Sequence, residues 1–202
     1  MNFPKTSGQC KYMLALRSSK PIVIGTGPAG SGKTMLACQI ATEHILKHPR
    51  ARVVLTRPIV AADEDMGYLP GDMDQKMEPW TRPMYDIFEQ SMTHNQMDRC
   101  ISIEPLGYMR GRTFHHTLII ADEMQNSTPN QMKLLLTRIG EGTKIIVTGD
   151  LEQSDLEGDN GLENLVYKMQ CTELDYIQHV EMGDDDIVRH PAVKEVLGIL
   201  SK

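Results

Sequence analysis

The chain has 202 residues, of which 40% are hydrophobic and 24% charged, and its formal net charge is −6. This composition is ordinary for a globular protein, and the negative charge argues against a nucleic-acid binder held by a general positive field. No stretch approaches the roughly 20 apolar residues of a membrane span, and the start lacks the apolar region of a secretory signal. We expect a single domain over residues 1–202, in the cytoplasm and without membrane contact.

The predicted helices and strands alternate along the chain. Apolar runs predict buried strands and amphipathic stretches predict helices, although Pro79 and Pro83 must start or kink one of these helices. In chain order we predict a helix over 8–17, a strand over 22–24, a helix over 33–47, a strand over 52–55, an irregular loop over 59–73, a helix over 74–97, strands over 101–104 and 118–121, a helix over 128–139, a strand over 144–148, a helix over 160–169, a strand over 176–180 and a last helix from 184 or 191 to the end. This alternation indicates an α/β fold of three layers, with helices on both faces of a mostly parallel sheet.

A glycine-rich segment follows the first predicted strand and precedes a helix. It matches the pattern G-x-x-x-x-G-K-[ST] throughout and reads Gly27-Pro28-Ala29-Gly30-Ser31-Gly32-Lys33-Thr34. Glycines let the backbone approach an anion, and consecutive N–H groups at a helix start form a nest for phosphate. Lys33 can bridge the β- and γ-phosphates of ATP, and the Thr34 hydroxyl can bind Mg²⁺. The segment predicts a P-loop nucleotide site; the alternative is an ordinary glycine-rich turn.

Two acids end the predicted strand over 118–121. Asp122 would hold Mg²⁺ through its water shell, and Glu123 would orient the water that attacks the γ-phosphate. Taken alone, the two acids could equally be a solvated pair at a strand end. Together with the glycine-rich segment they complete the predicted ATP site.

A polar segment follows the predicted strand over 144–148 and could sense the γ-phosphate. Gln153 is the candidate for that sensor, with Asp150 behind it. The alternative is a plain turn, because a Gly-Asp pair after a strand is common in turns.

The order of these motifs resembles that of the PhoH-like family, and the resemblance covers nearly the whole chain. The matching segments are Thr26 to Thr34, Arg57-Pro58, Gly67-Tyr68-Leu69-Pro70-Gly71-Asp72, Met109-Arg110-Gly111-Arg112-Thr113, Asp122-Glu123-Met124-Gln125-Asn126 and Gly149-Asp150. That family is similar to the first RecA-type core of superfamily-one helicases. The resemblance therefore implies a RecA-like P-loop ATPase, and some family members carry RNA-directed activities.

The resemblance also implies roles for single residues. Gln9 is similar to a helicase glutamine that reads the two polar edges of adenine. Gln125 is similar to the glutamine that couples nucleotide state to nucleic acid. Arg189 matches a terminal segment of the family and could contact a neighbouring subunit's γ-phosphate; the alternative is a salt bridge to Asp184, Asp185 or Asp186.

The chain departs from the helicase pattern in two respects. Met124 replaces the alanine usual after the two acids, which is a mild change. A second RecA core, which normally closes the ATP site with arginines, is not recognisable in the sequence. We therefore expect either a homo-oligomer, with a ring as one form of it, or slow and regulatory turnover.

Basic residues occur in loops that we expect at one end of the sheet, and they are candidates for binding single-stranded RNA. Aromatic side chains beside arginines can stack bases while the guanidinium groups hold phosphates. The alternative is that these side chains pack the loops or line a subunit interface, since acidic residues share the region. The basic candidates are Arg57, Arg82, Arg110 and Arg112, and the aromatic ones are Trp80, Tyr68 and Tyr108.

The function that these motifs favour is an oligomeric ATPase that acts on or near RNA. A small-molecule kinase would use the same P-loop, but such kinases usually carry an arginine-rich lid and lack the Asp-Glu-x-Gln box. A nucleotide-regulated binding module with little turnover would need the P-loop but not Glu123. The presence of Glu123 and Gln153 favours turnover.

Overall fold

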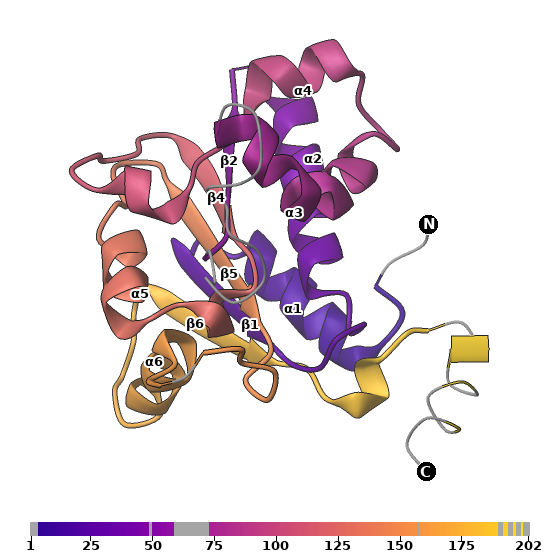
Figure 1. Cartoon of the computed structure of the whole chain (residues 1–202), viewed down its shortest axis with the longest axis vertical. Helices are drawn as coiled ribbons and strands as arrows, with labels where there is room; N and C mark the ends of the chain where they lie inside the picture. The colour runs from indigo at the N-terminus through magenta and orange to yellow at the C-terminus, as the bar shows by residue number, and fades with distance from the viewer. Residues whose placement is uncertain are drawn as a thin grey trace.

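The computed structural model describes residues 4–48, 50–58, 73–156 and 158–189, and the single positions 192, 193, 196 and 199; the side chains of residues 73–80 are outside this description. Its centre is a six-stranded sheet with the strand order β3-β2-β4-β5-β1-β6 (Figure 1). The strands are β1 (Ile22–Thr26), β2 (Arg52–Thr56), β3 (Ile101–Ile103), β4 (Thr117–Ala121), β5 (Lys144–Gly149) and β6 (Ile177–Glu181). The helices are α1 (Ser7–Arg17), α2 (Lys33–Lys47), α3 (Met73–Phe88), α4 (His94–Cys100), α5 (Pro129–Leu136) and α6 (Gly161–Met169), with the 3₁₀ turns η1 (Leu106–Met109), η2 (Met124–Asn126) and η3 (Asp184–Asp186).

All strand pairings in this sheet are parallel. The α/β fold predicted from the sequence is confirmed. The central strands β1 and β4 are buried at every position, which explains why their sequences read as unbroken apolar runs.

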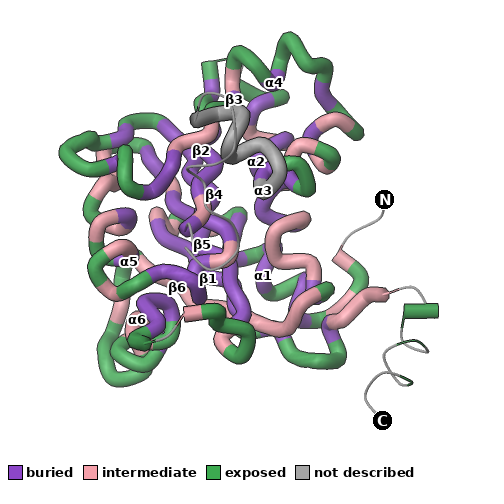
Figure 2. Tube along the Cα trace, in the orientation of Figure 1, coloured by how far each residue is buried: buried purple, intermediate pink, exposed green. Residues whose placement is uncertain are grey.

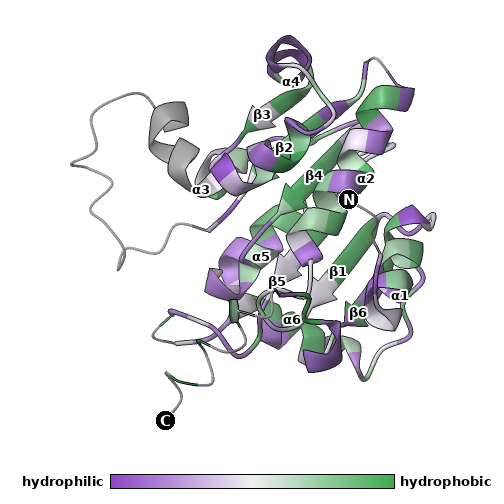
Figure 3. Cartoon of the chain, turned by 90° about the vertical axis from the view of Figure 1, so that its right-hand side faces the viewer, coloured by the Kyte–Doolittle hydropathy of each residue, from purple (hydrophilic) through white to green (hydrophobic). Residues whose placement is uncertain are grey.

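The sheet separates two hydrophobic cores, and helices cover both of its faces (Figure 2). Alternate strand residues point to opposite faces. Along β4, Leu118 and Ile120 belong to the core shared with α1, α2 and α3, whereas Ile119 and Ala121 belong to the core shared with η1, α5 and α6. This alternation gives the three-layer architecture that the sequence predicts. The green strands in Figure 3 lie between these helical layers.

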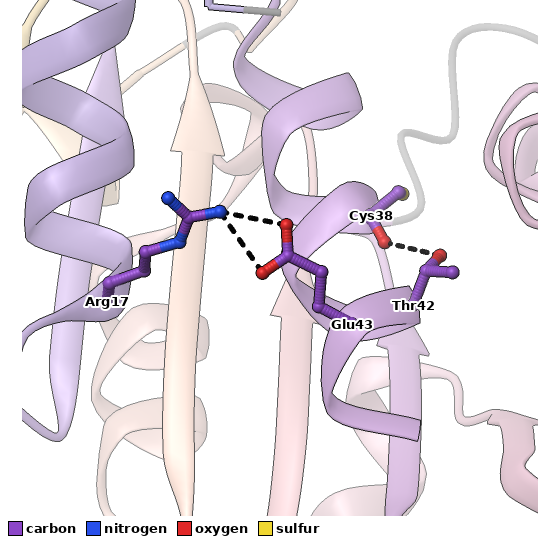
Figure 4. A network of polar contacts seen from close by, with 4 residues as sticks. All are labelled: Arg17, Cys38, Thr42 and Glu43. Atoms are coloured by element: carbon purple, nitrogen blue, oxygen red, sulfur yellow. Dashed lines mark hydrogen bonds and ion pairs between the residues drawn. The ribbon is translucent and has the colours of Figure 1, made fainter. Parts of the chain in front are cut away.

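A polar contact holds two of these helices together. The guanidinium of Arg17, at the end of α1, donates to both carboxylate oxygens of Glu43 on α2 at 2.8 and 3.1 Å (Figure 4). Within α2 the hydroxyl of Thr42 donates to the carbonyl of Cys38 at 2.9 Å. The ion pair thus joins α1 to the helix that begins at the glycine-rich loop, while the bond of Thr42 lies within that helix.

Several element boundaries differ from the sequence predictions. The helix predicted over 74–97 is two helices: α3 runs through both prolines to Phe88, and α4 begins after Thr93. The helix predicted over 128–139 ends at Leu136, where the Thr137 hydroxyl donates to the Lys133 carbonyl. Near the end of the chain, η3 is followed by helical backbone at 192, 193, 196 and 199. The loop predicted over 59–73 lies outside the described residues except for its last position. Among the described residues no helix has the length and apolar character to cross a bilayer.

The carboxyl ends of the parallel strands meet at one edge of the sheet. In the sheet, β4 and β5 lie between β2 and β1. The loops that follow the neighbouring strands β1, β5 and β4 therefore lie side by side at this edge. In open parallel sheets such a reversal of strand order creates a crevice where ligands bind. The predicted glycine-rich loop follows β1 and enters α2 at Lys33, Asp122 and Glu123 follow β4, and Gln153 follows β5.

Candidate active site

The glycine-rich loop joins β1 to the start of α2. Gly27, Gly30 and Gly32 have φ angles of 142°, 87° and 89°, which side chains other than glycine rarely adopt. The backbone also passes close to a neighbour at Gly27, where an added Cβ would lie 2.3 Å from the Met182 carbonyl oxygen. The loop then enters α2 at Lys33, so the first N–H groups of a 15-residue helix face the same place.

Lys33 lies folded against this loop. Its Nζ donates to the Gly27 carbonyl at 2.6 Å, the Pro28 carbonyl at 2.9 Å and the Ser31 hydroxyl at 3.4 Å. Burial lowers the pKa of Lys33 below its usual value, although the nearby Asp150, Glu123 and Asp122 oppose that shift. The ammonium thus lies among loop carbonyls and three acids, within reach of any anion that the loop holds.

Asp122 lies at the end of β4 and is buried. Its Oδ1 accepts hydrogen bonds from the hydroxyl of Thr34, at 2.7 Å, and from the hydroxyl of Thr148 on β5. The Thr34 hydroxyl and the Asp122 carboxylate are hard oxygen donors next to a phosphate loop. Such a pair fits Mg²⁺, which binds few protein oxygens and keeps several of its waters.

Glu123 adopts the left-handed conformation, with a φ of 53°. The amide of Gln125 holds it: Nε2 donates to Glu123 Oε2, and Oε1 accepts from the main-chain N–H of Asp150 at 3.1 Å. Gln125 is nearly fully buried, and it links the acid after β4 to the turn after β5. Met124, the departure from the family pattern, is fully buried in the core below η2.

The loop after β5 packs against the same acidic segment. Asn126 and Asp155 exchange two hydrogen bonds, at 3.1 and 2.9 Å, and the Ser154 hydroxyl donates to the Gln125 carbonyl at 3.0 Å. Gln153 is exposed in this loop, and its main-chain N–H donates to the Asp150 carbonyl at 3.3 Å. The amide that touches Glu123 is therefore that of Gln125, and a sensor role for Gln153 stays a prediction.

A cleft of about 320 Å³ opens beside the loop, at the ends of β1, β5 and β6. Its polar lining is acidic and includes Asp150, Glu152, Glu181 and Asp184. Of these carboxylates, that of Asp150 also lies near the Lys33 ammonium. Bound phosphates would face them as like charges, which favours a cation between the two.

Gln9 is buried behind the loop, and its amide is engaged with main-chain groups. Nε2 donates to the Ser31 carbonyl at 3.0 Å and to the Asp186 carbonyl at 3.3 Å, and Oε1 accepts from the Lys5 N–H at 2.8 Å. An adenine contact would have to replace one of these partners, and that role stays a prediction.

Arg189 lies on the loop of its own chain. Its Nη2 donates to the Ala29 carbonyl at 2.7 Å. Among the described residues its guanidinium makes no salt bridge to Asp184, Asp185 or Asp186. The contact with a neighbouring subunit stays a prediction.

The structure does not bring the predicted basic residues together at one end of the sheet. Arg57 follows β2 at the carboxyl edge, whereas Arg112 shares a surface hollow with Arg52 and Thr117, which begin β2 and β4. The Arg112 guanidinium donates to Glu104 at 2.6 Å and lies 4.7 Å above the Phe114 ring. Arg82 pairs with Asp86 on α3 and with Glu89 directly after it, and Arg110 is exposed. The motif around Tyr68 and the side chain of Trp80 lie outside the described residues.

Sequence reasoning missed two contributors to the site. Thr148 is visible in the segment before Gly149, yet nothing in its sequence context shows that it donates to Asp122. The sequence suggests Asp186 only as a partner for Arg189. In the structure it accepts hydrogen bonds from the Thr6 hydroxyl and the Gly8 N–H, about 180 positions earlier. Contacts over such a separation have no local sequence signal.

Comparison with known proteins identifies relatives over nearly the whole chain. The family described as PhoH-like protein matches residues 3–201. A PhoH-like protein of Bacillus subtilis is 42% identical over 204 residues, which cover 98% of this chain and 63% of the relative. Protein PhoH of Escherichia coli K12 is 37% identical over 202 residues, which cover 96% of this chain and 56% of the relative. The chain thus spans 56% to 63% of the length of these two proteins.

Comparison with solved structures supports the fold. The large terminase of a thermophilic bacteriophage superposes with a TM-score of 0.60 at 13% identity, over 99% of this chain and 51% of the terminase. The Pif1 helicase of Candida albicans superposes with a TM-score of 0.51 at 16% identity, over 100% of this chain and 44% of the helicase. At these identities the likeness shows a shared RecA-like core and no more.

Proposed function

The chain belongs to the PhoH-like protein family, and we propose that it binds ATP with Mg²⁺ and hydrolyses it to ADP and phosphate. The observation that carries this proposal is the convergence of two loops at one edge of the sheet. The loop after β1 supplies a phosphate nest and Lys33, and the end of β4 supplies Asp122 and Glu123. The hydrogen bond between Thr34 and Asp122 joins the two halves at 2.7 Å.

Each side chain has a distinct part in this reaction. Lys33 would leave the loop carbonyls and neutralise charge on the β- and γ-phosphates. Thr34 and Asp122 would hold Mg²⁺, which would supply further neutralisation when bound. Glu123 would orient a water and accept its proton as the water oxygen bonds to the γ-phosphorus. The bond from that phosphorus to the bridging oxygen breaks, and the leaving charge goes to ADP.

The charges around these side chains support the roles proposed for them. Three acids lie near Lys33, and a charged ammonium is more stable beside them than its half-buried position alone would make it. Asp122 accepts two hydroxyl hydrogen bonds, which fix the position of its carboxylate beside the loop. A kinase would need a second substrate at the γ-phosphate, and the acids of the cleft would repel an anionic one.

We further propose that the ATPase acts on or near single-stranded RNA and that it assembles as a homo-oligomer. Arg57 and Arg110 support the first part, because neither side chain is in an ion pair among the described residues and both keep exposed surface. Arg112 could contribute only by exchanging Glu104 for a phosphate. A binding module with little turnover stays the alternative.

The test is phosphate release from ATP by the purified chain, with and without a single-stranded RNA oligonucleotide. We expect Mg²⁺-dependent release that the RNA increases. Arg57→Ala and Arg110→Ala should lower that increase while leaving release without RNA unchanged. Arg17→Ala is a matched control, since this exposed guanidinium pairs with Glu43 and is not among the RNA candidates. An equal rate with and without RNA would remove the RNA part of the proposal, and no release at all would leave the binding module.

A further inference from the structure

We propose that residues 182–189, here called the arm, clamp the phosphate loop in its anion-binding shape, with Asp186 and Arg189 as the positioning residues. The arm follows β6 and passes beside α1 (Figure 1). The inference rests on the proposed nucleotide site and adds to it a segment that lies outside the motifs of that site.

The arm touches the loop along its length. The Met182 N–H donates to the Thr26 carbonyl at 2.8 Å, just before the loop begins. The Val188 N–H donates to the Gly30 carbonyl at 3.1 Å, and Arg189 donates to the Ala29 carbonyl at 2.7 Å. An added Cβ at Gly30 would lie 2.7 Å from Arg189 Nε, so the backbone and the guanidinium are in close contact.

Asp186 anchors the arm to the start of α1. Its Oδ1 accepts from the Thr6 hydroxyl and from the Gly8 N–H, the latter at 3.0 Å, and its Oδ2 accepts from the Gly183 N–H at 3.0 Å. Burial alone would raise the pKa of Asp186, but these hydrogen bonds lower it below its usual value. The carboxylate is thus charged and held by three donors from two segments.

Gln9 completes the connection between the anchor and the loop. It follows Gly8 directly, and its amide donates to the Ser31 carbonyl of the loop and to the Asp186 carbonyl of the arm. Loss of Asp186 would therefore release the arm and also weaken the support behind Ser31.

The direction of these hydrogen bonds explains what the clamp does. In a trans peptide the C=O and the following N–H point in opposite directions. Arg189 and Gln9 hold the carbonyls of Ala29 and Ser31, so the N–H groups of Gly30 and Gly32 point away from both side chains. The clamp thus orients loop amides toward the anion before the anion arrives, which reduces the ordering that binding would otherwise require.

The first readout is independent of nucleotide. Hydrogen exchange is measured on the peptide that carries residues 27–36, where the Ser31 N–H donates to Pro28 and the Leu36 N–H donates to Gly32. We expect faster exchange in Asp186→Ala and in Arg189→Ala than in the wild type. Arg189→Lys keeps a donor for Ala29 and should restore slow exchange. Arg138→Ala, which removes a guanidinium from carbonyls far from the loop, should change nothing there.

The second readout is binding and turnover of a fluorescent ATP analogue. Removal of one charged hydrogen bond to the loop should weaken binding about tenfold, with a smaller fall in the turnover of bound nucleotide. If Asp186→Ala fails to fold, Asp186→Asn keeps one acceptor oxygen and Arg189→Ala leaves the anchor intact. Unchanged loop exchange in folded alanine variants would overturn the clamp. If the loop exchanges faster in the variants but the wild-type protein binds no ATP, the clamp is retained and the nucleotide site is refuted.

Mixing subunits separates the clamp from action on a neighbour. A clamp works within one chain, so Arg189→Ala subunits mixed with Lys33→Ala subunits should show no recovery of turnover. Recovery would show that Arg189 serves another subunit's site, and it would overturn the assignment of Arg189 to its own loop.

Discussion

Lys33 shows how one side chain can serve both the loop and an anion. Its Nζ donates to two loop carbonyls and a hydroxyl, all within 3.4 Å. A phosphate would compete for the same donors, and the ammonium would exchange neutral acceptors for a charged one. The ammonium would then face an opposite charge in place of a neutral carbonyl, and this Coulomb attraction favours the exchange.

Replacing Lys33 by alanine should therefore remove turnover and weaken nucleotide binding by about tenfold or more. The fold should remain, because Lys33 contacts the loop surface and not the core. Phosphate release and thermal unfolding check the two parts. Lys144→Ala is a matched control: Lys144 is also a half-buried lysine that donates to a carbonyl, that of Ser18 at 2.7 Å, but it begins β5 at the opposite edge. A Lys33→Ala protein as active as the Lys144→Ala protein would exclude the proposed site.

Asp122→Asn should raise the Mg²⁺ concentration required for ATP binding by roughly tenfold, because a neutral amide oxygen is a weaker ligand for the ion. The asparagine can still accept from Thr34 and Thr148, so the structure should persist. Titration with Mg²⁺ at fixed ATP measures the shift. An unchanged Mg²⁺ requirement would show that Asp122 has a structural role and does not bind the ion.

The residues of the site differ in how far the sequence reveals them. Lys33, Thr34, Asp122 and Glu123 follow from local patterns, since a loop between a strand and a helix and an acid at a strand end have fixed positions in a parallel sheet. The contacts of Arg189 do not follow from any local pattern. Its contact with Ala29 joins residues 160 positions apart and depends on the path of the chain after β6.

At the scale of elements, the junction of β1, the loop and β6 leaves no space at Gly27. Its φ of 142° suits glycine, and an added Cβ would lie 2.3 Å from the Met182 carbonyl oxygen. Both the strain and the clash oppose a side chain at this position. The close approach of the segment after β6 to the loop thus explains the first glycine of the motif in this chain.

Gly27→Ala should lower the free energy of unfolding by about 2 kcal/mol or more, as expected for a side chain forced into a disfavoured backbone conformation. Urea unfolding measures the change. Gly107→Ala is the control, because an added Cβ there meets nothing within 4 Å. Equal stability of the two variants would mean that the loop can move away from Met182 freely.

Element boundaries show where sequence patterns were insufficient. The end of α3 and start of α4 were hidden within one predicted helix, although Thr93 and Gln96 form a capping box that could have marked the break. The existence and order of the strands were predictable, because parallel strands buried on both faces are unbroken apolar runs. The exact ends of helices depend on single side chains, such as the Thr137 hydroxyl that donates to a carbonyl of the last turn of α5. Neighbouring positions for a helix end are close in energy, so the sequence does not decide between them.

At the scale of the whole molecule, acid should destabilise the fold. Burial lowers the pKa of His179, whose Nε2 lies 2.7 Å from the Thr26 hydroxyl, although Glu181 opposes the shift. As the pH falls below about 6.5, the His179 imidazole is protonated in the unfolded chain before it is protonated in the folded one. Its contribution to the free energy of unfolding is therefore complete above that pH and is lost below it. The low pKa of Asp186 adds a further loss at lower pH, as its carboxylate becomes protonated.

His179→Gln should reduce the loss of stability between about pH 7 and pH 5, since glutamine keeps a hydrogen bond to Thr26 without a titrating group. Denaturant unfolding at a series of pH values measures this dependence. A variant with the same pH dependence as the wild type would assign the loss to other groups, such as His44, whose pKa burial and His48 also lower.

Of the two acids after β4, Asp122 is proposed to serve Mg²⁺ binding and Glu123 to serve hydrolysis, and the variant Glu123→Gln separates these two roles. The amide keeps the shape of Glu123 and its place beside Gln125, but it cannot accept a proton from water. The measurement is a single-turnover assay with labelled ATP and Mg²⁺, which reports bound nucleotide and released phosphate from the same sample. We predict that the variant binds ATP about as tightly as the wild type and releases phosphate at least roughly 100-fold more slowly. Phosphate release at the wild-type rate would show that Glu123 is not the base for hydrolysis.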